Sequence, residues 1–383
     1  MWNWKKIQTL VPPSGTAEVD FAACLDAFPQ LEKAKLTPQD PVYHAEGDVW
    51  THTQMVIRAL LDDAHYAQLD QRDRETVFLA ALLHDVAKCS TTVIADDGRI
   101  SQPGHSRKGA VDARIALWEA GAPVLQREAI CRLITVHQVP FFAFADSRRG
   151  HSAEFIVREL SWIVGDVHLL CMLARADIVG RICPDVGSVL VNIDLVREMA
   201  AEENCLRSPR SFASPETAVR YFRGAELHPD YALHEEPGSN VIIMCGLPAS
   251  GKNTWVAQHC ADWPVVSYDD ARTELGLRHG ENDGAAAHRA VDKAKALLRD
   301  KQRFVWNATH LSKQMRSKSL DLCLAYGATV NLVHLEAPKA ELLARNHARD
   351  TTLTNAALLN MLHRWEVPLA TEAHSLQLLE HQS

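Results

Sequence analysis

The stretch VIIMCGLPASGKNTW, residues 241–255, decides the fold of the second half of the chain. An apolar run ends in a glycine-rich turn that carries Lys252, and a helical pattern follows. Backbone N–H groups of such a turn and of the helix N-terminus point at a bound phosphate, and the lysine reaches the terminal phosphate oxygens. The alternative is a glycine-rich turn with an incidental lysine. We expect a nucleotide to contact Gly246, Pro248, Ser250, Gly251, Lys252, Asn253 and Thr254.

One letter of this loop departs from the usual pattern. Asn253 follows the lysine directly, where Ser or Thr is usual, and the hydroxyl comes one residue later at Thr254. The order resembles a variant in adenylate kinases, which implies that nucleotide binding survives the change. Thr254 is therefore the candidate for contact with Mg²⁺.

Beyond residue 240, short β-rich runs alternate with helical patterns, which predicts βαβ units and a parallel sheet. The carboxyl edge of such a sheet receives Asp269, Asp270 and Arg272, since SYDDAR ends the second β-rich run. A carboxylate there can take the proton of a hydroxyl nucleophile in phosphoryl transfer. A helix N-cap is the alternative for Asp270, or for both aspartates. Further on, the spacing of four places Arg345 and Arg349 on one helical face. The two arginines form either a lid over a triphosphate or a solvated charge stripe.

The first half of the chain has another pattern. From about residue 50 to 205 the apolar spacing is helical almost throughout, and no segment alternates like a strand. We therefore expect an all-helical domain over residues 1–235, with its core at about 40–205, and a P-loop α/β domain over 236–383. A helix within 208–228, with Ser214 as N-cap and Pro215 in its first turn, either ends the first domain or braces the two.

The composition is that of an ordinary multidomain protein, with 47 % hydrophobic and 23 % charged residues and a net charge of −8. This acidic balance argues against a general DNA-binding surface, although local basic clusters can still guide a nucleic-acid end. The nine cysteines form no CxxC pair, which favours reduced core thiols over disulfides or a zinc knuckle. Without a long apolar run or a signal-peptide pattern, we expect a cytoplasmic protein with no membrane partner.

The adjacent pair His84-Asp85 lies in an apolar helical pattern, where unpaired ionisable groups are costly. His52 upstream and Asp177 downstream complete a mixed nitrogen and oxygen set that suits a divalent transition metal such as Mn²⁺, Co²⁺ or Ni²⁺. Polar residues satisfied within the core are the alternative. Two further histidines, His105 and His137, lie between the doublet and Asp177 and are candidate ligands.

The order His52, His84-Asp85, Asp177 resembles the HD-domain phosphohydrolases, with Lys88 as the lysine of their HDxxK motif. The resemblance implies that Lys88 serves catalysis, and that His105 and His137 bind a second ion or contact phosphate. The segment EGDVWTHTQMV also resembles HD domains appended to CCA-adding enzymes, which implies ribose 2′ and 3′ phosphates as substrates.

The second half resembles the 5′-hydroxyl polynucleotide kinases through SGKNTW, Asp269-Asp270-Ala271-Arg272, Thr309-His310-Leu311-Ser312 and Arg345-Asn346-His347-Ala348-Arg349. The resemblance implies that Lys252 binds phosphate and that Asp269 is the general base. It further implies that Arg272 holds the 3′ phosphate of the acceptor end and that Arg349 stabilises the transferring phosphoryl group. His310 stands where these kinases have Asn, which leaves its role open.

The domain order resembles the bacterial bifunctional HD–polynucleotide kinase end-healing enzymes. The resemblance implies metal-dependent removal of 2′,3′-cyclic phosphate and 2′-phosphate ends, together with phosphorylation of RNA or DNA 5′-OH ends by ATP or another NTP with Mg²⁺. A separate ligase would then seal the strand. The rivals are a small-metabolite kinase fused to an HD nucleotidase, a regulator whose HD half binds a nucleotide, and a scaffold that only binds ends.

Overall fold

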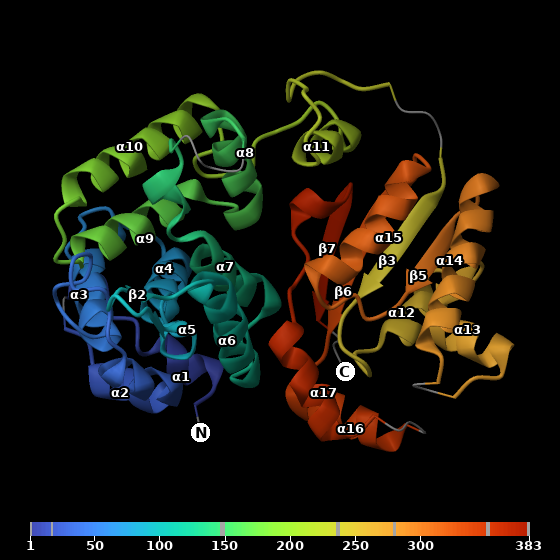
Figure 1. Cartoon of the computed structure of the whole chain (residues 1–383), viewed down its shortest axis with the longest axis horizontal. Helices are drawn as coiled ribbons and strands as arrows, with labels where there is room; N and C mark the ends of the chain where they lie inside the picture. Colours follow the sequence, from blue (N-terminus) through green and yellow to red (C-terminus); the bar gives the residue numbers. More distant parts are fainter. Residues whose placement is uncertain are drawn as a thin grey trace. The chain divides into compact units, whose positions relative to one another are not determined.

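The computed structural model describes residues 2–16, 18–145, 150–234, 238–278, 281–349 and 353–380. The chain divides into two compact units, Met1–Arg210 and Ser211–Ser383 (Figure 1). The expected boundary between residues 235 and 236 lies outside the described residues. The helix expected within 208–228 groups with the second unit.

The first unit is built from helices whose apolar faces share one core. Side chains of Asp48, Asp70, Ser152 and Asp166 accept hydrogen bonds from backbone N–H groups in the first turns of α3, α4, α8 and α9, and so begin these helices. The α-helices are α1 Trp4–Gln8, α2 Phe21–Ala27, α3 Val49–Leu61, α4 Gln71–Leu83, α5 Lys88–Thr91, α6 His105–Glu119, α7 Val124–Val136, α8 Ala153–Val164, α9 Val167–Val179 and α10 Val186–Glu202. Short 3₁₀ helices are η1 Pro29–Leu36, η2 Tyr66–Gln68 and η3 Val139–Phe142.

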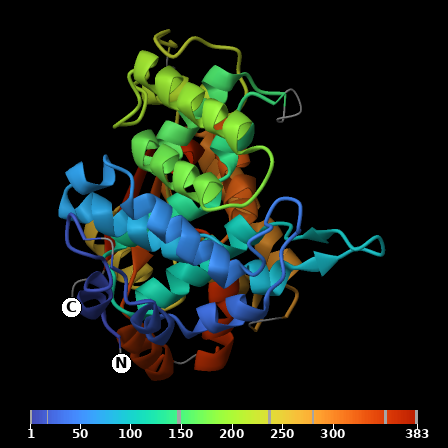
Figure 2. The same ribbon diagram turned by 90° about the vertical axis from the view of Figure 1, so that its left-hand side faces the viewer.

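One part of this unit is not helical. Strands β1 (Val93–Ile94) and β2 (Ile100–Ser101) form an antiparallel hairpin that projects from the helices (Figure 2). The expected helical class of the first half is confirmed, and this hairpin is an exception that the sequence did not reveal, because two-residue strands are too short to show alternation. The turn signal was present: Asp97-Gly98 stands between the strands, and Gly98 has a positive φ of 83°.

The second unit contains a five-stranded, all-parallel sheet in the order β4-β5-β3-β6-β7. The chain runs from the central strand β3 to the edge strand β4, returns to β5 and then crosses to β6, so the order switches beside the carboxyl end of β3. The strands are β3 Asn240–Cys245, β4 Val265–Ser267, β5 Phe304–Asn307, β6 Thr329–Glu336 and β7 Ser375–Glu380. The helices are α11 Pro215–Phe222, α12 Lys252–His259, α13 Tyr268–Leu275, α14 Asp283–Arg299, α15 Lys313–Ala325, α16 Lys339–Ala348 and α17 Asn355–Met361, with 3₁₀ helices η4 Leu362–Arg364 and η5 Ala370–Glu372.

Alternation along the strands gives this sheet two buried faces. Val241, Ile243 and Cys245 point into one core, and Met244 points into the other with Val256 of α12. The expected alternation of short strands and helices around a parallel sheet is confirmed, and the structure adds α13, α17 and β7. Alternating apolar and polar residues in SLQLLE carry the signal for β7.

Helix α11 begins as expected, because the Ser214 side chain accepts from Thr217 N and Pro215 occupies the first turn. Glu216 of α11 also lies 2.7 Å from Nε2 of His374, directly before β7. The helix is thus tied to the sheet of its own unit. Among the described residues, no helix has the length and apolar character that a membrane crossing requires.

Candidate active sites

The first candidate site gathers six buried side chains from five helices and their ends. His52 lies on α3 and Asp177 on α9, while His84 and Asp85 follow α4. His105 opens α6 and His137 ends α7. Donor atoms of these residues approach one another within 4.8 Å in overlapping groups of three. The structure therefore brings together all six HD-half residues that the sequence marked as metal ligands, namely His52, His84, Asp85, His105, His137 and Asp177.

All four histidines point Nε2 towards the centre of the cluster, because Nδ1 of each ring is held by a backbone carbonyl group. Nδ1 of His84, His105 and His137 lies 2.7, 2.8 and 2.8 Å from the carbonyl oxygen three residues earlier. Nδ1 of His52 faces the carbonyl oxygen of Gly180 at 3.2 Å. Because a carbonyl oxygen can only accept, each Nδ1 donates and the neutral ring leaves a lone pair on Nε2. This is the arrangement of metal-binding histidines, whose second nitrogen donates to backbone or carboxylate.

The inward atoms lack partners of their own. Nε2 of His137 and Oδ1 of Asp85 are buried without a hydrogen bond to any described residue, and Nε2 of His84 faces only Oδ2 of Asp85, at 3.1 Å. Each buried, unsatisfied group costs about 1–3 kcal/mol. Nε2 of His52 likewise faces Oδ1 of Asp177 at 3.1 Å. A divalent cation between these nitrogen and oxygen donors would satisfy them, so the residues fit a transition metal.

Two buried cations accompany the two carboxylates. Lys88 Nζ lies 2.7 Å from Oδ2 of Asp85 and 2.7 Å from Oε1 of Gln39. Arg181 Nη2 lies 2.7 Å from Oδ1 and 2.8 Å from Oδ2 of Asp177. Arg181 was not predicted from the sequence. Its position four residues after Asp177 was the feature that could have indicated it. Burial alone would raise the pKa of each aspartate, but the neighbouring cations and histidines hold both pKa values well below their usual range.

Burial sets the charge of the imidazoles. It lowers the pKa of His137 to about 3 and also lowers the pKa of His105, so both rings are neutral at neutral pH and can bind a metal. Burial alone would lower the pKa of His84 too, but the charge of Asp85 outweighs it and the pKa is raised. A metal at His84 therefore competes with a proton for Nε2.

Behind His52 lies a carboxylate that the sequence reading also missed. Oε1 of Glu46 is 3.0 Å from Nδ1 of His52 and 2.8 Å from Nδ1 of His44. Its Oε2 accepts from the backbone N–H of Ile182. Burial would raise the pKa of Glu46, but these hydrogen bonds lower it, so the group stays ionised and orients His52.

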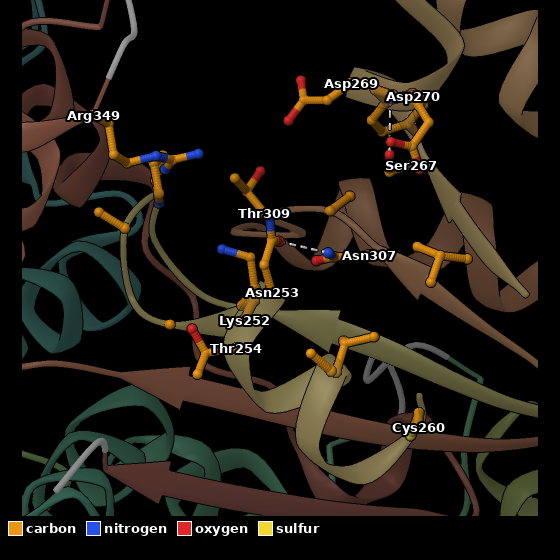
Figure 3. Close-up of a pocket in the computed structure, with 18 of the residues that line it drawn as sticks. Lys252, Asn253, Thr254, Cys260, Ser267, Asp269, Asp270, Asn307, Thr309 and Arg349 are labelled. Atoms are coloured by element: carbon orange, nitrogen blue, oxygen red, sulfur yellow. Dashed lines mark hydrogen bonds between the residues drawn. The ribbon is translucent and has the colours of Figure 1, made fainter. Parts of the chain in front are cut away.

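The second candidate site is a cavity of about 1110 Å³ at the carboxyl end of the parallel sheet (Figure 3). It is lined by nine of the residues expected from the sequence, namely Pro248, Gly251, Lys252, Asn253, Thr254, Asp269, Arg272, Arg345 and Arg349. Gly246 and Ser250 are not among the described lining residues and instead shape the loop. A Cβ at Gly246 would lie 2.2 Å from the carbonyl oxygen of Leu335, and φ is +135°, so only glycine fits there.

Lys252 is buried at the start of α12, and its ammonium donates to the carbonyl oxygens of Gly246 and Leu247 at 3.0 and 2.7 Å. Burial lowers the pKa of Lys252 to about 8. The loop thus holds the lysine with its own carbonyl groups, which phosphate oxygens can replace.

The aspartate pair lies in the first turn of α13. The N-cap of this helix is Ser267, whose Oγ accepts from Asp270 N, so neither aspartate is the N-cap. The side chain of Asp269 is 83 % exposed, and its Oδ1 lies 2.8 Å from Nη1 of Arg272. Figure 3 shows the Asp269 carboxylate and the Arg349 side chain on opposite sides of the space above the loop.

The remaining polar residues of interest lie around the loop. Arg345 on α16 pairs with Glu341 and also lines the cavity. His310 is buried, with Nδ1 2.9 Å from the carbonyl oxygen of Met244 and Nε2 2.9 Å from Oγ of Ser319. Burial lowers the pKa of His310 to about 4, so this neutral ring links β3 to α15. Its position in the structure is that of a packing residue behind the loop.

Comparisons with known proteins agree with this architecture. The HD domain family model matches residues 49–157, and the AAA domain family model matches residues 241–368. A kinase-like protein from Chloroflexus aurantiacus is 19 % identical over 38 % of this chain and 86 % of its own, with a TM-score of 0.30. A gluconokinase from Sinorhizobium meliloti 1021 is 18 % identical over 38 % of this chain and 84 % of its own, with a TM-score of 0.27. A search of curated proteins found no match.

The chain therefore joins a helical domain that matches the HD family to a P-loop domain with a parallel sheet that matches the AAA family. The HD domain implies a divalent metal, for which the buried histidine and aspartate cluster supplies the donors. The kinase-like domain implies a nucleotide with Mg²⁺.

Proposed function

We propose that the protein heals broken nucleic-acid ends. Its HD half removes 2′,3′-cyclic phosphate and 2′-phosphate, and its P-loop half phosphorylates 5′-OH ends of RNA or DNA with ATP or another NTP. The observation that carries the proposal is the presence, in one chain, of a histidine–aspartate metal cluster with two buried cations and a phosphate loop facing Asp269. Breakage of RNA leaves both kinds of end, and neither can be ligated directly, so a separate ligase would act next.

In the HD half, a metal held by His52, His84, Asp85 and Asp177 would polarise the phosphate and lower the pKa of a bound water. His105 and His137 face the same centre and either bind a second ion or contact phosphate. Lys88 and Arg181 each neutralise one carboxylate and lie where a phosphate oxygen could take over their charge. The near-complete burial of the cluster strengthens these interactions.

In the P-loop half, Lys252 and the loop N–H groups bind the β- and γ-phosphates. Asp269 is exposed in the cavity, where it can accept the proton of the 5′-OH. Arg349 approaches from the other side and can stabilise charge on the phosphoryl group in flight. Thr254 and Asn253 line the cavity beside the loop, on the side assigned to the metal.

The charge at the edge of the cavity favours a polynucleotide acceptor. The cavity, of about 1110 Å³, holds the nucleotide as well as the acceptor. Arg272 lies between Asp269 and Asp283 at the cavity edge, where its guanidinium can hold the phosphate that follows the first nucleotide. A neutral small-metabolite acceptor, such as a free sugar, has no need of such a cation.

The test uses a short RNA with a 5′-OH and a 2′,3′-cyclic phosphate, incubated with ATP, Mg²⁺ and added Mn²⁺, Co²⁺ or Ni²⁺. Both ends are followed on one denaturing gel. We expect both ends to change in the wild type, only the 3′ end in Lys252→Ala and only the 5′ end in Asp85→Ala. Adenosine or a sugar phosphorylated as fast as an oligonucleotide would instead indicate a metabolite kinase. Loss of both activities from one substitution would contradict two separate sites.

A further inference from the structure

Asn307 is the last residue of β5, the strand between the phosphate-loop strand and the strand that leads to Asp269. It pairs in register with Met244 of β3 and Ser267 of β4. It also lines the cavity, and Figure 3 shows its amide beside Asn253 of the loop. Asn307 thus lies at the carboxyl edge of the sheet, where this fold class binds its ligands.

The two asparagines form one hydrogen-bonded unit. Nδ2 of Asn307 donates to Oδ1 of Asn253 at 2.8 Å. Oδ1 of Asn307 is buried and has no hydrogen-bond partner among the described residues. In this orientation the pair keeps one carbonyl oxygen, Oδ1 of Asn307, without a donor, whereas the side chain of Asn253 is exposed.

The phosphate groups of a nucleotide cannot satisfy this oxygen, because phosphate oxygens are acceptors like the amide oxygen itself. A cation that accompanies the phosphates, or a water held by that cation, can satisfy it. P-loop NTPases place a hydroxyl and a carboxylate on the metal side. Here the cavity has the hydroxyl of Thr254 and, beside it, the amides of Asn253 and Asn307. Of the described residues that line the cavity, the carboxylates are Asp269 and Asp270, and Asp269 is held by Arg272.

We propose that Asn307, supported by Asn253, positions the hydrated Mg²⁺ of the nucleotide through a neutral carbonyl oxygen where related enzymes use a carboxylate. This inference rests on the proposed binding of an NTP by the second unit. A neutral pair attracts the free ion weakly and does not repel the γ-phosphate, so the metal arrives with the nucleotide. Installing a carboxylate should strengthen the dependence of nucleotide binding on metal, and removing the oxygen should weaken it.

The experiment measures binding of a fluorescent ATP analogue to the full chain by anisotropy, with Mg²⁺ and with EDTA. The quantity compared between variants is the dissociation constant in EDTA divided by the dissociation constant in Mg²⁺. Asn307→Asp should raise this ratio about tenfold, and Asn307→Leu should lower it about tenfold, the size of one hydrogen bond to a charged partner. Effects of the chelator on the first unit are common to all variants.

A matched control exists in the same sheet. Asn331 of β6 donates through Nδ2 to Oδ1 of Asn240 at 2.8 Å, and Asn240 is the first residue of β3, at the edge away from the phosphate loop. Asn331→Asp and Asn331→Leu should leave the ratio unchanged. If both Asn307 variants have the same ratio as the wild type, the inference about the metal is wrong, while the nucleotide site itself is unaffected. Failure of the wild type to bind the analogue under either condition would overturn the proposed function and this inference together.

Discussion

The guanidinium of Arg181 contacts both carboxylate oxygens of Asp177, at 2.7 and 2.8 Å, within the predicted metal cluster. The two side chains are 10 % and 0 % exposed, and the ring of Phe141 lies 5.1 Å from the guanidinium carbon. A metal ion that binds Asp177 must therefore share or displace this arginine. Because both compete for the carboxylate of Asp177, metal binding there would free the guanidinium of Arg181 to contact a phosphate.

Replacing Arg181 with methionine should separate these two roles. Breaking a buried ion pair from one side costs about 3–5 kcal/mol, so we expect Arg181→Met to lower the melting temperature of the metal-free protein. Removal of the competitor should tighten Mn²⁺ binding by about tenfold or more, while hydrolysis of a 2′,3′-cyclic phosphate slows. Calorimetric titration with Mn²⁺ and melting curves measure both effects. Arg175→Met on α9, where the side chain is 47 % exposed, should change neither the melting temperature nor the metal affinity. Unchanged metal affinity in Arg181→Met would refute the competition.

The carboxylate behind His52 offers a second prediction. Glu46→Gln keeps the shape of the side chain but removes the charge that Nδ1 of His52 faces at 3.0 Å. Loss of such a supporting contact typically costs about 10–100-fold in metal affinity, and we expect a decrease in this range by Mn²⁺ titration. The exposed pair of Asp63 with Nδ1 of His65, also at 3.0 Å, supplies the comparison. If Asp63→Asn lowers the Mn²⁺ affinity as much as Glu46→Gln does, the decrease comes from the loss of a negative charge and not from the orientation of His52.

The buried Lys252 predicts how nucleotide binding responds to pH. Its pKa of about 8 in the free loop is lowered from the ordinary value by burial, so the side chain is charged below pH 8 and increasingly neutral above it. Phosphate binding requires the charged form, so above pH 8 each binding event takes up a proton. Affinity should therefore be constant from pH 6.5 to 7.5 and then fall by up to about tenfold per pH unit. ATP-analogue titrations from pH 6.5 to 9.5 test this. Lys252→Arg, which does not titrate, should lose the pH dependence, and a flat wild-type profile would contradict the assignment.

Local patterns predicted the fold of the second unit well, because each strand and helix carries its own periodicity and Lys252 marks the loop between them. The metal cluster was also predictable, since ionisable residues such as His84 stand out in an apolar helix. Glu46, Arg181 and Asn307 were not found. Their importance comes from a neighbour brought close by folding, and an isolated glutamate, arginine or asparagine has no pattern of its own. The strands of the hairpin were missed because two residues span a single period and cannot show a repeat.

The contact between α3 and α9 sets the geometry of the metal cluster and provides the last prediction. A Cβ on Gly180 would lie 2.7 Å from Val56 N and 2.8 Å from Val56 Cα, and both atoms are backbone, so an alanine must push α9 away from α3. The same glycine accepts from His52 Nδ1 through its carbonyl oxygen at 3.2 Å. Overpacking of this kind costs about 1–3 kcal/mol, and the shift would move His52 away from Asp177.

Gly180→Ala should therefore lower the melting temperature and weaken Mn²⁺ binding in the same protein. Gly187→Ala in α10 is the matched change, because a Cβ added there would have no atom within 4 Å and no positive φ restricts the residue. That substitution should leave metal affinity unaltered and raise stability by up to about 0.5–1 kcal/mol, the usual gain of alanine over glycine in a helix. Wild-type Mn²⁺ affinity in Gly180→Ala would show that the cluster tolerates displacement of α3, and that the spacing between the two helices does not set its geometry.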